Sequence, residues 1–419
     1  MDQEKFDEKY LLLCMGLDQK AKEKFAVGKL NRDDIPFIDG PDSMKRGAES
    51  LEALPKLSRL HDLSVELGEA IFGRGSPIEG PQRKDYLYRV LGGLNTFTRV
   101  LMGEDIPYRE RVRSYYEITP RKTPEDELLS RLNQLDEALP GRGSLKKRHM
   151  RWRSKQNVPR ERTGEVLTSF IGETRKRARK IFELPRGERV EIELVKTAPW
   201  AGYNTFRGNG RSKVTINLQY PLTISRLMGL GTHESYPGHH VEHMLKEELL
   251  GKGEGFVEET VLTYCSPKCP VSEGIAQLGL DLIFDGGLRG ALEWYNSNTR
   301  KGKIDTDTSL YVMDASTNLV TGARENAALM LHSDGESEDY VKGYLRAWLN
   351  FHPALVGGVM GFINHPLFET YIFNYRGEDH VKNAYRDALK AGVSKDVLVP
   401  RLYTTQLTPD TLHYLSDPV

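Results

Sequence analysis

Apolar residues that recur at helical spacing set the architecture of this chain. The clearest example begins at Thr123-Pro124, a pair typical of a helix start, and ends before Pro140-Gly141. Between them lies a row of leucines three or four positions apart: Leu128, Leu132, Leu135 and Leu139. Similar patterns cover residues 1–185 and resume from Thr223 to about residue 393. The chain is therefore predicted to be mainly α-helical.

Residues 186–218 have the composition of β-strands instead. They contain two β-rich runs, RVEIELV and KVTINL, and the turn-forming Gly208-Asn209-Gly210 precedes the second run. This predicts a hairpin or a small sheet beside the helices. We divide the 419-residue chain into an N-terminal helical region, residues 1–185, and a second region, residues 186–419, which can together form one continuous fold.

The charge balance argues against nucleic acid or membrane as a partner. Lysine and arginine together number 59, as do aspartate and glutamate, so the formal net charge is zero. Residues 142–162 are a local exception, with nine basic residues against Glu161. This basic segment could bind nucleic acid with Trp152 as a stacking surface, but a solvated helix face explains it more simply.

Cysteine content and hydropathy bear on the location of the protein. The chain has three cysteines, a number that fits structural thiols in a reducing cytoplasm better than a disulfide framework. No run approaches the roughly 20 apolar residues of a membrane span. We therefore expect a cytoplasmic protein in which Cys14, Cys265 and Cys269 are structural.

A cluster of histidines carries the strongest functional signal. Four of the chain's eleven histidines fall within residues 233–243, where Glu234 and Glu242 accompany them: His233, His239, His240 and His243. Neutral imidazole is a good zinc ligand, and a neighbouring carboxylate can act as general base. The cluster therefore predicts a zinc site, and residues 186–419 become the catalytic region.

Two arrangements of this zinc site are possible. The first extends the motif H-E-x-x-H, with His233-Glu234 followed by His239 or His240. In a straight helix His239 would lie on another face and His240 about 10 Å further along the axis, so Pro237-Gly238 must break the helix. The second is the inverted motif H-x-x-E-H, which needs no break: His239, Glu242 and His243.

The segment HESYPGHH, residues 233–240, resembles the H-E-x-x-P-G-H-H motif of the domain of unknown function 885 family. That family is a group of proposed zinc peptidases, and its fold resembles that of the thermostable H-E-x-x-H carboxypeptidases. Glu273-Gly274-Ile275-Ala276 is similar to the family's E-G-W-A, with isoleucine in place of tryptophan. The resemblance implies an elongated, mainly α, zincin-like fold with a small β-sheet beside the active-site helix.

The resemblance also implies roles for individual residues. His233, His239 and Glu273 would bind zinc, and Glu234 would be the general base. His239 is preferred to His240 as ligand because it directly follows a glycine, which leaves His240 to contact the substrate or a ligand. Tyr375 lies in a stretch similar to a family Y-x-x-G region and could steady an oxyanion.

These observations predict a zinc-dependent hydrolase, most similar to a carboxypeptidase, that acts on a peptide or small amide substrate. Glu234 would take the proton of a zinc-activated water. The strand KVTINL, residues 213–218, is expected to pair with an extended peptide. The alternatives are an amidohydrolase for a small amide, a metallopeptidase that has lost turnover, and a nucleic-acid-binding protein built on the basic segment.

Overall fold

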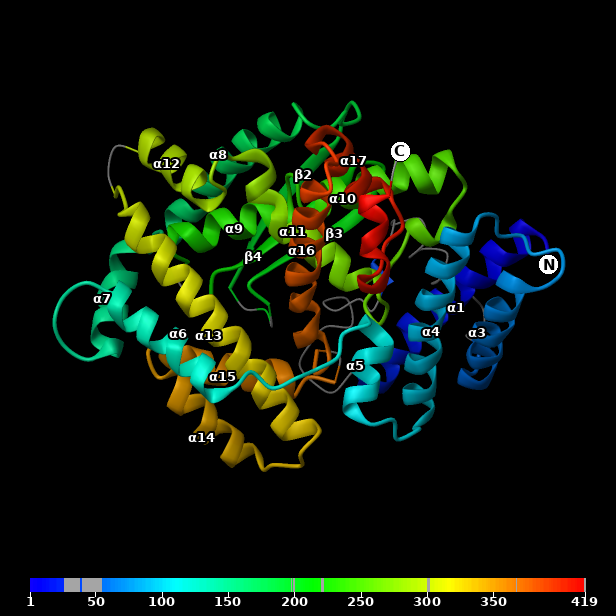
Figure 1. Ribbon diagram of the computed structural model, residues 1–419, viewed down its shortest axis with the longest axis horizontal. Coiled ribbons are helices and arrows are strands. Elements are labelled where there is room, and N and C mark those ends of the chain that lie inside the picture. Colours follow the sequence, from blue (N-terminus) through cyan, green and yellow to red (C-terminus); the bar gives the residue numbers. More distant parts are fainter. Residues whose placement is uncertain are drawn as a thin grey trace.

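Helices make up most of the protein and enclose a small sheet (Figure 1). The computed structural model describes residues 1–25, 38–39, 55–196, 198, 200–219, 222–299, 302–366 and 368–417. Within these residues the predicted mainly α fold, with a small β-sheet beside the histidine-bearing helices, is confirmed.

The N-terminal helices gather at one end of the molecule, coloured blue to cyan in Figure 1. Their apolar faces repeat every three or four residues, as in α3, where Leu60, Leu63 and Leu67 are fully buried. These helices are α1 (Gln3–Phe25), α3 (Leu57–Phe72), α4 (Pro81–Met102) and α5 (Tyr108–Tyr116).

The leucine row lies on α6 (Glu125–Ala138), followed by α7 (Leu145–Gln156) and α8 (Arg160–Ala178). Leu128 and Leu135 are fully buried, so this part of the pattern is confirmed. The helix starts one residue later than predicted, with Pro124 at the N-cap. Thr123 does not cap it, because its hydroxyl oxygen lies 3.5 Å from an Arg376 guanidinium nitrogen and bonds no N–H of the helix.

The sheet has three strands in the order β2 (Arg189–Val195), β4 (Arg211–Asn217) and β3 (Gly202–Gly208). The predicted hairpin joins β3 to β4 antiparallel through Asn209-Gly210, and β2 pairs with β4 in parallel. The strand β3 was not predicted from sequence. It is the first strand of the hairpin. The run RVEIELV, which was expected to be that strand, forms β2 instead.

The central helices follow the sheet in the chain and lie against it. They are α9 (Ile224–Glu234), α10 (His239–Leu245) with its π-helical extension η1 (Lys246–Gly253), and α11 (Lys268–Ile283). Between η1 and α11 lie η2 (Val257–Glu259) and β5 (Leu262–Thr263), and β5 pairs with β1 (Ile38–Asp39).

Of the remaining helices, α16 runs beside α11 at the centre of the view, and α13, α14 and α15 lie toward the lower left (Figure 1). The helix α16 packs along α11, and α13 packs along α6. The bounds of this group are α12 (Leu288–Asn298), α13 (Thr306–His332), α14 (Glu338–Leu349), α15 (Pro353–Ile363), η3 (Tyr371–Arg376), α16 (Gly377–Lys390), α17 (Lys395–Thr404) and η4 (Pro409–Ser416).

Two clusters of buried apolar side chains form the core. One contains the N-terminal helices together with α13, α14 and α15, and the other contains the sheet, α8 to α12, α16 and α17. Each cluster takes residues from both sides of residue 185, so the two predicted regions share their cores. The central helices belong mainly to the second cluster, which gives the histidines a rigid support.

Candidate metal centre

The helix breaks inside the histidine motif, as the spacing of its histidines requires. The helix α9 ends at Glu234, α10 begins at His239, and Ser235 between them has φ −125° and ψ −100°. Gly238 lies directly against the end of α9, where an added Cβ would come within 1.9 Å of the His233 carbonyl oxygen. Only glycine fits this position, and the turn that it permits returns α10 to His233.

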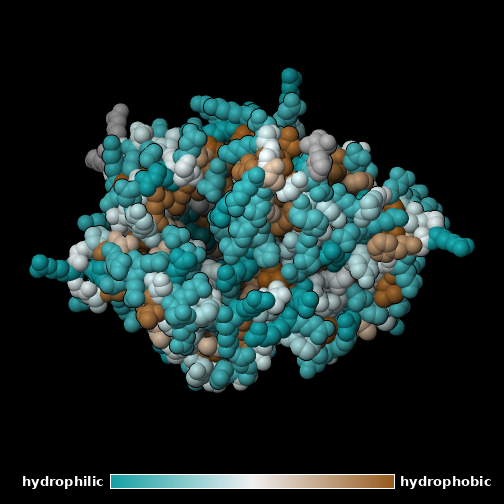
Figure 2. Space-filling view, viewed as in Figure 1, coloured by the Kyte–Doolittle hydropathy of each residue, from teal (hydrophilic) through white to brown (hydrophobic). Residues whose placement is uncertain are grey.

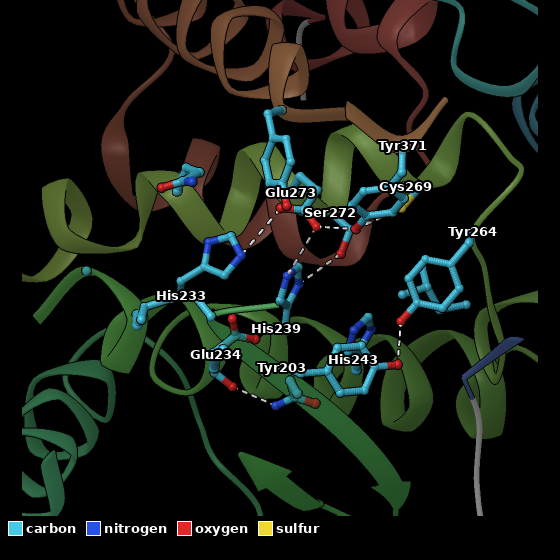
Figure 3. Close-up of a pocket in the computed structure, with 18 of the residues that line it drawn as sticks. Tyr203, His233, Glu234, His239, His243, Tyr264, Cys269, Ser272, Glu273 and Tyr371 are labelled. Atoms are coloured by element: carbon cyan, nitrogen blue, oxygen red, sulfur yellow. Dashed lines mark hydrogen bonds and ion pairs between the residues drawn. The ribbon is translucent and has the colours of Figure 1, made fainter. Parts of the chain in front are cut away.

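The break brings His233 and His239 together (Figure 3). Their ring centroids are 4.6 Å apart and the ring planes are inclined by 81°. Among the described residues, His233, Glu234 and His239 form a group whose possible ligand atoms all lie within 4.8 Å of one another. This juxtaposition is the basis of the candidate metal centre.

Glu273 faces the same two rings from α11. Its Oε2 lies 3.4 Å from His233 Nε2, and its Oε1 lies 3.9 Å from His239 Nε2. Ligands about 2.1 Å from a tetrahedral zinc ion are separated by about 3.4 Å. Glu273 Oε2 is buried and has no hydrogen-bond partner among the described side chains. A divalent cation between these three side chains would satisfy that oxygen, so the residues fit a zinc ion.

Two carboxylates therefore compete for the place of third ligand. Glu273 Oε2 lies at the spacing of a tetrahedral site from His233 Nε2, and the Tyr371 hydroxyl donates to Glu273 Oε1, which holds the carboxylate toward the histidines. Glu234 extends from the last turn of α9, and its backbone carbonyl accepts from Asn204 Nδ2 at 2.6 Å. Both carboxylates lie near the two histidines, so Glu273 as ligand and Glu234 as general base stay predictions.

The electrostatic environment suits a bound cation. Burial disfavours the charged form of His239, but the negative charges of Glu242, Glu273 and Glu234 around the ring outweigh burial and raise its pKa to about 9. Burial alone would raise the pKa of Glu273, but His233 and His239 lower it to about 2. Burial raises the pKa of Glu234, as expected for a general base that must take up a proton.

The inverted motif does not gather in the same way. Glu242 is fully buried and accepts from Lys246 Nζ at 2.8 Å and from Ser272 Oγ at 2.6 Å. His243 stacks on His239 with centroids 5.6 Å apart, and burial lowers its pKa to about 3. Glu242 and His243 lie next to the group formed by His233, Glu234 and His239 and are not part of it. The structure therefore favours the extended H-E-x-x-H motif over the inverted one.

His240 lies away from the site, contrary to its predicted contact with substrate. Its ring is completely buried, with Nδ1 2.8 Å from Ser212 Oγ and Nε2 3.3 Å from Glu188 Oε2. Consecutive residues of a helix point about 100° apart, so His239 and His240 cannot both face the metal centre. His240 instead holds α10 against β4 and Glu188.

A pocket surrounds the metal centre. Figure 2 shows a hollow on the face over α9 and β4, and the pocket contains both histidines of the metal centre with Glu234 and Glu273 in its lining. At one side β3 and the segment after β5 meet through the hydroxyls of Tyr203 and Tyr264, which are 2.6 Å apart. Another part of the lining contains Arg226 and Tyr375, over whose ring the Arg324 guanidinium lies at 4.4 Å. The predicted residue Tyr375 therefore lines the same pocket as Glu234.

The strand available to a peptide is β3 rather than KVTINL. The run KVTINL includes most of β4, which is hydrogen-bonded to β2 on one side and to β3 on the other. A central strand has no free backbone groups to offer a peptide. β3 is at the edge of this sheet, and its residues Gly202, Tyr203 and Asn204 line the pocket.

The basic segment does not present a nucleic-acid surface built on Trp152. Its indole is only 6% exposed and packs against His149, so a base cannot stack on it. Arg148 donates to the carbonyl oxygens of Asp136 and Leu139 at the end of α6, which is a structural contact. None of the described helices combines the length and apolarity that crossing a bilayer requires.

Several residues of this site were not predicted from the sequence. Ser272, Tyr371 and Arg226 each lie in the pocket, and each comes from a helical segment that sequence reasoning assigned to the scaffold. Two of them had a usable signal. Ser272 directly precedes Glu273, and Arg226 is seven residues before His233, so both share a helix face or turn with a predicted ligand.

Comparison with known proteins identifies a fold but no family. No family model matches the chain, and no curated protein matches it, so the resemblance to the domain of unknown function 885 family stays a prediction. The chain is similar to a solved structure of a proposed lipoprotein from Colwellia psychrerythraea, with a TM-score of 0.51, 14% identity, and coverage of 85% of this chain. It spans 65% of the length of that protein, and the likeness shows a shared fold.

Two further solved structures are similar at lower scores. One is a proposed lipoprotein of unknown function from Shewanella oneidensis, with a TM-score of 0.45 and 12% identity over 98% of this chain and 72% of that one. The other is an M32 carboxypeptidase from Deinococcus radiodurans R1, with a TM-score of 0.44 and 12% identity over 99% of this chain and 94% of that one.

Proposed function

We propose that this protein is a zinc-dependent hydrolase that cleaves peptide bonds, and that it acts as a carboxypeptidase. The observation that carries the proposal is the convergence of His233, His239 and Glu273, with Glu234 beside them, in a single pocket. Two histidines and one carboxylate are the ligand set of hydrolytic zinc sites that keep one position open. A cytoplasmic location belongs to the same proposal, supported by three buried, free cysteines.

The predicted ligands, Glu234, Tyr375 and the strand β3 each have a separate role in the proposed reaction. Zinc held by the three ligands would polarise the scissile carbonyl and activate the attacking water. Glu234 accepts the proton of that water and returns it to the leaving amine. The Tyr375 hydroxyl donates a hydrogen bond to the oxygen that becomes negative during attack. β3 offers its free edge to the backbone of an extended peptide.

Arg226 supports cleavage at the C-terminus. Its side chain is exposed to the pocket, and no described carboxylate lies within ion-pair distance of it. It lies seven residues, about 10 Å along the axis of α9, before His233, so both side chains share a helix face and Arg226 can contact a substrate carboxylate that extends along the pocket from the metal centre.

The test uses N-blocked dipeptides with purified, zinc-loaded protein. We expect hydrolysis of the free acid, slower hydrolysis of the matching C-terminal amide, and loss of both activities with a zinc chelator. Arg226→Met should raise KM for the free acid by roughly 10- to 100-fold and leave the amide unaffected, as loss of a charged hydrogen bond predicts. Equal turnover of acid and amide would favour the amidohydrolase. Zinc binding without any hydrolysis would favour a protein that has lost turnover.

A further inference from the structure

A buried chain of polar groups begins at Nδ1 of His239, the ring nitrogen that is turned toward Ser272 (Figure 3). Ser272 Oγ is 3.2 Å from His239 Nδ1 and 2.6 Å from Glu242 Oε2, and Lys246 Nζ is 2.8 Å from Glu242 Oε1. Glu242 and Lys246 are at most 2% exposed, and Ser272 is 1% exposed. Such a chain costs desolvation energy, and a plain helix contact would not need it.

The direction of each hydrogen bond in this chain is determined by the groups themselves. An ionised carboxylate only accepts, and an ammonium only donates, so Lys246 and Ser272 both donate to Glu242. The serine hydroxyl has one proton, which it gives to Glu242. Its oxygen can then only accept from His239, so the His239 proton must be on Nδ1.

The opposite nitrogen of His239 is the one that faces the metal centre. His239 Nε2 lies 3.9 Å from Glu273 Oε1, whereas Nδ1 is turned toward Ser272. A neutral imidazole that carries its proton on Nδ1 has its free lone pair on Nε2, where a ligand needs it. The chain thus dictates both the orientation of the ring and the nitrogen that can bind a cation.

The same serine also connects the two elements that supply the ligands. Ser272 and Glu273 are adjacent on α11, while His239 and Glu242 are three residues apart on α10. The Ser272–Glu242 hydrogen bond therefore ties α10 to α11 beside the point where His239 faces Glu273. Loss of that bond would let the His239 ring rotate. It would also let His239 and Glu273, the two predicted ligands, move relative to each other.

We infer that Ser272, Glu242 and Lys246 form a positioning relay that fixes the tautomer and orientation of His239 for metal binding. None of the three touches the reacting atoms, and the relay acts only through His239. That the metal is zinc rests on the proposed function. The tautomer itself is a property of the chain and can be measured without a metal.

The decisive variant is Glu242→Gln. Lys246 would hold the amide oxygen, so the amide nitrogen would donate to Ser272. Ser272 would then donate to His239 Nδ1 and move the proton of the ring to Nε2, which blocks the lone pair. We expect zinc affinity, measured by competition with a chromophoric chelator, to fall by about 10- to 100-fold, the usual effect of losing a ligand's supporting partner. Ser272→Ala should weaken zinc binding over a similar range.

Glu247→Gln is the matched control. Glu247 is a buried glutamate that follows Lys246 on η1, and its carboxylate accepts from the Asn209 backbone N–H at 2.7 Å and pairs with Lys252 Nζ at 3.7 Å. Its substitution should leave zinc affinity unchanged. Circular dichroism and thermal unfolding of every variant show whether a loss of affinity reflects loss of the fold.

Nitrogen-15 NMR of the histidine rings tests the relay even if the protein binds no zinc. In the metal-free wild type at pH 10, above the raised pKa of His239, the remaining ring proton should be on Nδ1. In Glu242→Gln it should move to Nε2. A wild-type proton on Nε2, or wild-type zinc affinity in both Glu242→Gln and Ser272→Ala, would overturn the relay. Absence of zinc binding with the proton on Nδ1 would contradict the proposed function and leave the relay standing.

Discussion

Gly238→Ala should separate the two predicted histidine ligands. The new Cβ would lie 1.9 Å from the His233 carbonyl oxygen, and 2.5 Å from both the His233 carbonyl carbon and the Thr232 carbonyl oxygen. All three are backbone atoms, so no side chain can rotate away. An ordinary contact begins near 3.4 Å, so α9 and the start of α10 must move apart by about 1.5 Å.

That displacement exceeds what a metal site tolerates. Ligand distances in zinc sites hold to within about 0.2 Å, so a shift of this size removes His239 from the coordination sphere. We expect zinc affinity to fall by more than about 100-fold, beyond the loss of a supporting contact alone. Overpacking should also lower the free energy of unfolding by about 1–3 kcal/mol.

The assay combines zinc titration with urea unfolding on the same preparations. Gly172→Ala on α8 is the matched control, because an added Cβ there meets nothing within 4 Å. It should leave zinc binding unchanged and stabilise the helix by about 0.5–1 kcal/mol. Wild-type zinc affinity in Gly238→Ala would refute the argument that the close fit of Gly238 builds the site.

Three further predictions follow from the site and its surroundings. Glu234→Gln should reduce peptide turnover by about 10²–10⁴-fold and keep zinc at one per chain; loss of zinc would instead make Glu234 a ligand. Tyr375→Phe should lower kcat by roughly 10²–10³-fold with little change in KM; an unchanged kcat would return Tyr375 to packing. Burial lowers the pKa of His149 to about 4, whereas an unfolded histidine titrates near 6.5, so the unfolded state binds more protons between these values. Stability should therefore decline as pH falls from about 6.5 to 4, and His149→Phe should flatten that part of the curve of melting temperature against pH.

Local sequence patterns predicted the parts of the fold that depend on neighbours in the chain. The leucine row of α6 follows from the helical period, and the break at Pro237-Gly238 follows from the spacing that joint binding by His233 and His239 demands. The strand β3 was missed because GYNTFRG has glycines at both ends and no continuous apolar run. GYNTFRG is a strand because its backbone is hydrogen-bonded to β4, not because its residues favour a strand.

Four of the predicted site residues meet at the metal centre, and His240 does not. The structure brings together His233, Glu234, His239 and Glu273, whereas His240 faces Glu188 and β4 because a helix turns by about 100° between neighbouring residues. Tyr371 carries no local signal, and Ser272 and Arg226 are marked only by their positions relative to Glu273 and His233. Their roles depend on which helices pack around the motif, and contacts distant in sequence determine that packing.

Zinc-edge anomalous diffraction from crystals of the zinc-loaded protein tests the central claim most directly. The account predicts one strong peak per chain, about 2.0–2.2 Å from His233 Nε2, His239 Nε2 and a carboxylate oxygen of Glu273. It also predicts that Glu234 lies outside this coordination sphere and that His240 keeps its contact with Glu188. A peak bound by His243 and Glu242, or no peak at the His233–His239 pair after zinc is supplied, would contradict the account.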